Sequence, residues 1–233
     1  MIDAHAAPRS VGVVVVAAGS GSRLGAEVPK AFVEVAGRSL LSYAVERVAQ
    51  LPGLAHLVIV APRASLASAT SVATAADLPD ARVVAGGAER TDSVRAGLDA
   101  LGDCDLILIH DAARAFTPVA VFDRVVAAVG AGAAGAVPGL AVVDTIKSVD
   151  ADGIITGTPD RAALRAIQTP QGFDAKVLRA AYASGLSGSD DAALVEAIGN
   201  HVRVVDGDPM AFKVTTPEDL RRAEQLVAQG WLS

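Results

Sequence analysis

The chain has 233 residues, of which 52% are hydrophobic, and this length and composition suit one α/β domain with an insertion. The net charge of −6 argues against a protein that wraps nucleic acid, because such binding needs a basic face. A lone cysteine, Cys104, excludes an intramolecular disulfide framework, and no apolar stretch reaches the roughly 18 residues of a membrane span. We therefore expect a cytoplasmic protein that binds neither nucleic acid nor a membrane.

Strand-like and helix-like segments alternate from residue 11 to the C-terminus, after a tail over 1–10 that has no periodic pattern and that we expect to be flexible. The apolar runs that predict strands are 13–18, 57–61, 82–85, a run starting at 105, 134–138, 164–168 and 202–206, with a short strand near 32–35. The helical spacings cover 39–50, 64–76, 91–101, 118–129, 175–184, 190–198 and a helix capped by Thr216, while 169–173 is predicted to be a turn. This order predicts a Rossmann-like, three-layer α/β domain over 11–233 with a mostly parallel sheet.

A glycine-rich loop follows the first predicted strand. Gly19, Gly21 and Gly25 surround Arg23, and Lys30 follows directly after a proline. The spacing fits neither the dinucleotide fingerprint nor the Walker loop, since the third glycine is one residue late and no Gly-Lys-Ser/Thr ending is present. Backbone N–H groups and two cations would suit a polyphosphate, and the competing interpretation is a tight turn with surface charges. The two cations favour the polyphosphate site.

Two later segments carry polar or flexible residues at predicted strand ends. Gly86-Gly87 follows the strand over 82–85, where the backbone could approach a ligand closely. His110, Asp111 and Arg114 follow the strand that starts at 105. Ligands of open α/β sheets bind at the carboxyl ends of the strands, so these three polar residues favour a binding site over surface decoration.

A hairpin interrupts the alternation of strands and helices. Two β-rich runs, 142–149 and 154–156, flank an Asp-Gly turn and are not followed by a helix. We interpret 139–161 as an arm that projects from the domain and pairs with a second subunit.

These separate motifs, taken together, resemble the 2-C-methyl-D-erythritol 4-phosphate cytidylyltransferases. The segments that carry the resemblance are 17–23 with Pro29-Lys30, Gly86-Gly87 with Arg90 and Ser93-Val94, 110–114, Asp144-Thr145, Arg161, 169–171 and 212–215. The resemblance implies a dimer formed through the arm and an enzyme that joins CTP and 2-C-methyl-D-erythritol 4-phosphate. The products would be the cytidine diphosphate alcohol and pyrophosphate, in non-mevalonate isoprenoid synthesis.

The resemblance also implies a role for each matching residue. The expected catalytic residues are Arg23 and Lys30, which would stabilise the transition state, and Arg161 and Lys213, which would position the substrate phosphate, Arg161 from the partner's arm. The expected nucleotide-binding residues are Ala17, Ala18, Gly19, Gly21, Gly86, Gly87 and Ser93. The expected substrate-binding residues are Asp111, Ala112, Arg114, Thr145, Thr169 and Ser189. Ser189 stands where the family has a threonine, which keeps the hydroxyl group and loses a methyl group.

The residue types suit this chemistry without reference to the family. Both reactants are anions, so fixed cations and a Mg²⁺ ion bound mainly through the CTP phosphates would offset their repulsion. A phosphomonoester has a second pKa of about 6, so its oxygen is already ionised near neutral pH and no general base is required. We expect His110 to be a hydrogen-bonding group, give Arg90 no role, and leave open whether Asp111 contacts the metal.

Two alternatives remain at this point. A cytidylyltransferase acting on ribitol or glycerol phosphate would use nearly the same cations and differ in the polyol pocket. A nucleotide-binding regulatory protein could keep the fold without turnover, although Arg23, Lys30, Arg161 and Lys213 are all present.

Overall fold

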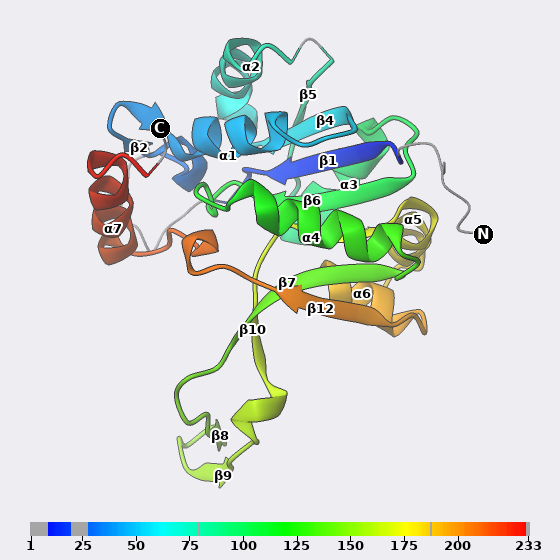
Figure 1. Ribbon diagram of the computed structural model, residues 1–233, viewed down its shortest axis with the longest axis vertical. Coiled ribbons are helices and arrows are strands. Elements are labelled where there is room, and N and C mark those ends of the chain that lie inside the picture. The colour runs from blue at the N-terminus through cyan, green and yellow to red at the C-terminus, as the bar shows by residue number, and fades with distance from the viewer. Residues whose placement is uncertain (1–8, 20–27, 79, 187, 232–233) are drawn as a thin grey trace, which may run out of the picture.

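The computed structural model describes residues 9–19, 28–78, 80–186 and 188–231, and the account that follows concerns these residues. Their centre is an eight-stranded sheet with the order β10-β7-β11-β6-β1-β4-β5, in which β12 also pairs with β7 (Figure 1). The strands are β1 (Val11–Val16), β4 (Leu54–Ala61), β5 (Arg82–Ala85), β6 (Leu106–Asp111), β7 (Gly135–Ala141), β10 (Arg165–Ile167), β11 (Gln171–Asp174) and β12 (Val202–Asp206). Only β10 and β11 run against the others, so the predicted mostly parallel sheet is confirmed.

Helices cover both faces of this sheet, as the three-layer prediction requires. The helices are α1 (Leu40–Ala49), α2 (Leu66–Ala75), α3 (Arg90–Ala100), α4 (Val119–Gly130), α5 (Ala175–Ala183), α6 (Asp191–Ala197) and α7 (Pro217–Ala228). Residues of α1, α2 and α4 share one apolar cluster, and residues of α3, α5 and α6 share another on the opposite face. No helix within the described ranges is long and apolar enough to cross a membrane.

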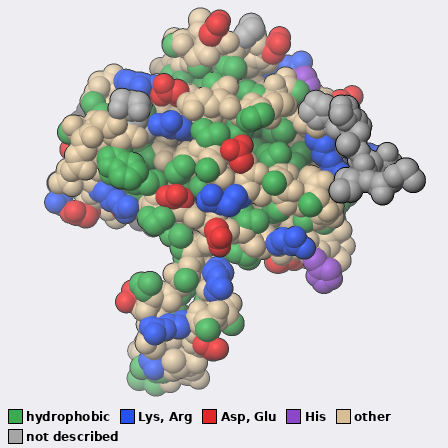
Figure 2. All heavy atoms as spheres, in the orientation of Figure 1, with side chains coloured by type: hydrophobic (Ala, Val, Ile, Leu, Met, Phe, Trp, Pro, Cys, Tyr) green, Lys and Arg blue, Asp and Glu red, His purple; other side chains and the backbone are tan. Residues whose placement is uncertain are grey.

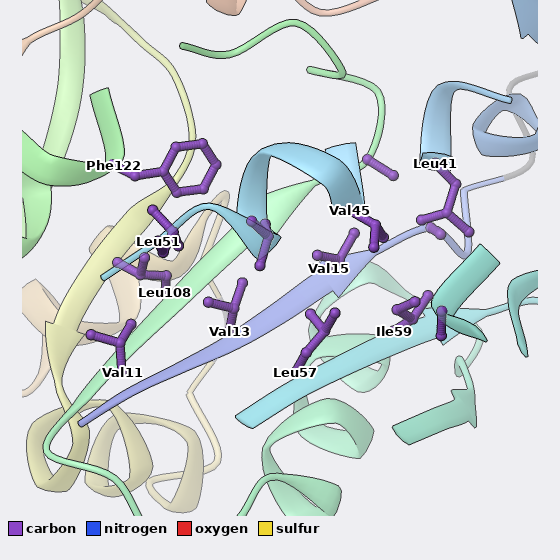
Figure 3. Packing of buried hydrophobic residues seen from close by; sticks show 14 of the residues in the cluster. Val11, Val13, Val15, Leu41, Val45, Leu51, Leu57, Ile59, Leu108 and Phe122 are labelled. Atoms are coloured by element: carbon purple, nitrogen blue, oxygen red, sulfur yellow. The ribbon is translucent and has the colours of Figure 1, made fainter. Parts of the chain in front are cut away.

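Strand β1 lies between these two clusters. Val11, Val13 and Val15 belong to the cluster under α1 and α4, whereas Val14 belongs to the cluster under α3 (Figure 3). Successive side chains of a strand point to opposite faces, so a run of valines is buried on both sides only in a covered sheet. Both faces of this strand are therefore apolar, and the glycine-rich segment of the sequence follows it after Val16.

Two predicted segments, a turn and a short strand, differ from the structure. The turn predicted at 169–173 is wrong, because Gln171–Asp174 form β11 in the middle of the sheet, antiparallel to both β6 and β7. This strand lacks the β-branched run that would announce it, and Gly172 packs where a Cβ atom would meet Val125 and Leu108. The short strand near 32–35 is a 3₁₀ turn, η2 (Lys30–Phe32), followed by the small hairpin of β2 (Glu34–Val35) and β3 (Arg38–Ser39).

The predicted arm projects from the sheet (Figure 1). Residues 139–141 still pair with β10, and Gly139 also pairs with β12, so the projecting part spans 142–164 rather than 139–161. It contains β8 (Ser148–Val149), β9 (Ile155–Gly157) and the 3₁₀ turn η4 (Arg161–Ala163). Its apolar side chains are exposed, as Figure 2 shows, and the most exposed is Val143 at 77%. Others are Ile146, Val149, Ile154 and Ile155.

Candidate active site

A cavity of about 350 Å³ opens at the carboxyl ends of β1 and β6. It is lined by Val16–Gly19 after β1, Lys30 and Ala31 of η2, Gly87–Arg90 and Ser93 around the start of α3, Asp111 and Ala113 after β6, and Lys213. Except for Lys213, which lies between the 3₁₀ turn η5 (Pro209–Ala211) and α7, each of these segments lies at the end of a strand or the start of a helix, so the fold itself brings them to one edge of the sheet.

The wall nearest β1 and β5 consists largely of backbone. The Ala17 N–H donates to the Val60 carbonyl at 2.7 Å, and the Gly86 N–H donates to Ala61 at 2.9 Å, which fixes both turns to β4. A Cβ atom on Gly86 would lie 2.5 Å from the Ala18 Cβ atom and 2.8 Å from the Ser93 hydroxyl. Glycine is therefore required at this position for the two turns to pack together.

Ser93 holds the glycine turn from the first turns of α3. Its hydroxyl accepts from the Gly87 N–H at 3.2 Å and donates to the Glu89 carbonyl at 3.1 Å. Ser93 is buried and lines the cavity together with Gly87. This side chain sets the shape of the turn, whose backbone faces the cavity.

Asp111 and Lys213, which also line the cavity, form an ion pair with 2.6 Å between Oδ2 and Nζ. Asp111 ends β6, and Lys213 is held by its neighbour Val214, which is buried and donates its N–H to the Ala113 carbonyl at 2.9 Å. Burial opposes ionisation of Asp111, but Lys213 and Arg90 outweigh it and hold the pKa of this carboxyl group well below its usual range. Asp111 is thus an anion at neutral pH.

Lys30 brings a second lysine to the cavity. It is the first residue of η2, whose turn is closed by the bond from the Val33 N–H to the Lys30 carbonyl at 3.1 Å. Ala31 beside it is buried in the core, which anchors the turn. Lys30 and Lys213 therefore come from opposite ends of the chain to line the same space.

Arg90 is a cavity residue that sequence reasoning did not assign. It is the first residue of α3, and its guanidinium group binds both carboxylate oxygens of Asp191, at 3.1 and 2.7 Å, while lying 3.5 Å from Asp111. Its position three residues after Gly86-Gly87 was a signal that it faces the same cavity. The partner that orients it lies 101 residues further along the chain, and no local pattern identifies such a pair.

Thr169, His110 and Arg114 support Asp111 from behind the cavity. The Thr169 hydroxyl accepts from the Asp111 N–H at 3.0 Å and forms a hydrogen bond of 3.0 Å with Nδ1 of His110. Arg114 donates to the carbonyls of Ala211 and Ile167 at 2.7 and 3.2 Å. His110 is fully buried, and this burial lowers its pKa to about 4. The expectation that His110 is a hydrogen-bonding group agrees with this environment.

Of the predicted site residues, the cavity brings together eight: Ala17, Ala18, Gly19, Lys30, Gly87, Ser93, Asp111 and Lys213. Gly86, Ala112, Arg114 and Thr169 lie beside it but do not line it, and Ala112 is fully buried in the core. Thr145, Arg161 and Ser189 are exposed elsewhere on the chain, with Arg161 donating to the Val143 carbonyl within the arm. Gly21 and Arg23 lie outside the described residues.

Known proteins match nearly the whole chain. The model of the 2-C-methyl-D-erythritol 4-phosphate cytidylyltransferase family matches residues 11–229. The chain belongs to this family. A 2-C-methyl-D-erythritol 4-phosphate cytidylyltransferase of Nocardia farcinica is 53% identical over 218 residues, which cover 94% of each chain. The solved cytidylyltransferase of Thermus thermophilus is 35% identical with a TM-score of 0.76, over 94% of this chain and 99% of its own.

A solved 4-diphosphocytidyl-2C-methyl-D-erythritol synthase of Anaerococcus prevotii is 28% identical, with a TM-score of 0.81 over 94% of this chain and 99% of its own. These matches confirm the family and the fold expected from the motifs. The chain is a cytidylyltransferase that uses CTP and 2-C-methyl-D-erythritol 4-phosphate to make the cytidine diphosphate derivative of methylerythritol. The regulatory alternative without turnover and the ribitol or glycerol alternative have no comparable support.

Proposed function

We propose that the cavity holds CTP and the polyol phosphate together and that it catalyses their reaction by positioning and electrostatics. The observation that carries this proposal is the meeting of Lys30 and Lys213 with the backbone turn at Gly87 in one cavity at the carboxyl edge of the sheet. Two polyanions require cations at fixed positions, and backbone N–H groups add donors without a mobile side chain.

The nucleotide would lie against the wall formed by Ala17, Ala18, Gly19, Gly87 and Ser93. Small residues here let the backbone approach a flat base closely, and Gly86 beneath them leaves room for the turn. Gly21 and Arg23 continue the loop toward the triphosphate in the sequence, and we propose that Arg23 acts with Lys30 on the reacting phosphate.

In the transfer step, a phosphate oxygen of the acceptor attacks the α-phosphorus of CTP. A new P–O bond forms, the bond to the β-phosphate oxygen breaks, and pyrophosphate leaves with the electron pair. Lys30 and Arg23 would stabilise the charge that builds up on the α-phosphate, and Lys213 would hold the acceptor phosphate. Such fixed cations act mainly through charge and orientation.

The attacking oxygen needs no protein base. A phosphomonoester with a second pKa of about 6 is mostly ionised at neutral pH. His110 does not line the cavity, and burial keeps its imidazole neutral with a pKa of about 4. We therefore assign His110 to the support of Thr169 and Asp111 rather than to proton transfer.

The described residues fit a Mg²⁺ ion that is held mainly by the nucleotide. No group of three His, Cys, Asp or Glu side chains in the described ranges could form a protein cage for a metal ion. Asp111 lines the cavity, and Mg²⁺ is commonly held by one or two carboxylates with substrate phosphates. Asp111 is the residue that we propose for this role. The ion would neutralise part of the triphosphate charge.

We propose a homodimer whose arms complete the two active sites. The support is the exposed apolar surface of the arm, including Val143 at 77% and Ile154 at 64%, together with the position of Arg161 and Thr145 in the arm and outside the cavity lining. A two-stranded hairpin is marginally stable alone, so a second surface would stabilise it. Arg161 and Thr145 would then reach the partner's cavity. Arg114, Thr169 and Ser189 would shape the polyol pocket, and the cytoplasm is the compartment that we propose.

The test is the release of pyrophosphate from CTP by the purified protein with Mg²⁺. 2-C-methyl-D-erythritol 4-phosphate, ribitol 5-phosphate and glycerol 3-phosphate serve as separate acceptors, and a reaction without acceptor gives the background. We expect the methylerythritol phosphate to give the highest kcat/KM. Release that does not depend on any acceptor, or that favours another polyol, would contradict the proposal.

A further inference from the structure

Asp191 is a buried anion just outside the cavity. It is the first residue of α6, its side chain is fully buried, and it does not line the cavity. Its carboxylate accepts two hydrogen bonds from Arg90, and Oδ1 also accepts from the Tyr182 hydroxyl at 2.5 Å. Burial of a carboxylate costs free energy unless the group is paired with a cation and hydrogen-bonded. Both oxygens of Asp191 accept hydrogen bonds here, and its paired cation is Arg90.

The pair that Asp191 forms continues into the cavity as a chain of alternating charges. Arg90 Nη2 lies 2.7 Å from Asp191 and only 3.5 Å from Oδ1 of Asp111. The other oxygen of Asp111 binds Lys213 at 2.6 Å. Asp191, Arg90, Asp111 and Lys213 thus alternate in sign from the buried core to the cavity.

Arg90 lies within reach of two carboxylates, those of Asp191 and Asp111, and it is hydrogen-bonded to Asp191. The two terminal nitrogens of Arg90 are both used by Asp191, in the bidentate geometry that is strongest for this pair. The Arg90 side chain is 32% exposed, so it has room to turn. Without the charge of Asp191, the nearest anion for Arg90 would be Asp111, which would then be drawn away from Lys213.

We infer that Asp191 is a positioning residue for the transfer reaction: it holds Arg90 at the edge of the cavity, so that Asp111 stays paired with Lys213. The inference rests on the proposed function of the cavity. It assigns to α6 a role in the placement of the acceptor phosphate, although Asp191 itself touches no reactant. The competing explanation is that the pair only ties α3 to α6.

A double-mutant cycle separates the two explanations. The chains are the wild type, Arg90→Gln, Asp191→Asn and the double variant, each assayed for kcat and KM with the methylerythritol phosphate and each checked for its melting temperature. We expect Asp191→Asn to lower kcat/KM by roughly 10- to 100-fold, the effect of misplacing a group by about 1 Å. In the Arg90→Gln background the same change should alter kcat/KM less than about twofold, because Asp191 acts through Arg90.

An equal loss in both backgrounds, or full activity of folded Asp191→Asn, would overturn the inference. Arg95→Gln is the control, because Arg95 lies on the same helix and pairs with the exposed Asp92, and it should keep wild-type activity. If Asp191→Asn does not fold, Arg90→Lys tests the same point, since lysine keeps the charge but cannot bind Asp191 through two nitrogens. Full activity of Arg90→Lys would contradict the inference, whereas an inactive wild type would contradict the proposed function instead.

Discussion

Substitution of Gly86 by alanine adds a single methyl group where the walls of the cavity meet. The new Cβ atom would lie 2.5 Å from the Cβ atom of Ala18 and 2.8 Å from the Ser93 hydroxyl. Carbon atoms in contact are about 3.5–4.0 Å apart, so Ala18 or the glycine turn must move by about 1 Å. Neither neighbour is the end of a flexible chain, because Ala18 follows β1 and the Ser93 hydroxyl holds Gly87 and Glu89.

We expect Gly86→Ala to lower stability by about 1–3 kcal/mol, the usual cost of overpacking, and to lower kcat/KM for CTP by about 100-fold, because the nucleotide wall is displaced. The measurements are thermal unfolding and the release of pyrophosphate. Gly130→Ala is the matched control, since a Cβ atom at the end of α4 would have no neighbour within 4 Å. Wild-type activity and stability of Gly86→Ala would refute the close packing of the two turns.

Three further predictions address the lysine, the buried histidine and the dimer. Lys30→Ala should lower kcat by about 10²–10³-fold with a much smaller effect on CTP binding, and unchanged turnover would remove Lys30 from the mechanism. His110 has a pKa near 4 in the native state and 6.5 when unfolded, so its contribution to stability should fall by about 3 kcal/mol as the pH drops from 7 to 4, because the unfolded chain takes up the proton at a higher pH than the folded chain. His110→Asn, which can still bond to Thr169, should reduce this loss, and an identical pH dependence would count against a buried neutral imidazole. Inactive Arg161→Ala and Lys30→Ala chains should regain up to half of the wild-type dimer activity per heterodimer when mixed under subunit exchange, and no recovery after proven exchange would place Arg161 in its own subunit's site.

The parts of the fold that sequence predicted are those with strong local signals. β1 is a run of valines with both faces buried, and the helix over 39–50 has regular apolar spacing and begins after the capping residue Ser39. The last helix has its predicted Thr216 cap, with Pro217 at the first helical position. In each case the residues that form the element also carry its pattern.

The parts that sequence missed depend on contacts between distant residues. β11 is short, and its position between β6 and β7 is set by the sheet rather than by its own composition. Gln171 at its start donates to Asp190 and accepts from the Ala192 N–H, contacts that only the folded chain creates. The same limit applies to Arg90, whose partner Asp191 lies 101 residues further along the chain.

The candidate site shows the same division. Lys30 could be predicted because it follows the glycine-rich loop, and Gly87 because it belongs to the Gly86-Gly87 pair. Both residues line the cavity. Thr169 could be placed near the site only by resemblance, and its hydroxyl is found behind the cavity, bonded to the Asp111 backbone and to His110. A motif can indicate that a residue belongs to a site, but the direction of its side chain is decided by packing.

The central claim, that the cavity transfers the cytidylyl group of CTP to a phosphate oxygen, is tested most directly by following the phosphorus atoms. CTP labelled at the α-phosphorus and CTP labelled at the γ-phosphorus are incubated separately with the enzyme, Mg²⁺ and 2-C-methyl-D-erythritol 4-phosphate. The account predicts that the α label enters the cytidine diphosphate alcohol and that the γ label leaves as pyrophosphate. Transfer of the γ label to the acceptor, or an α label that stays in CTP, would contradict it.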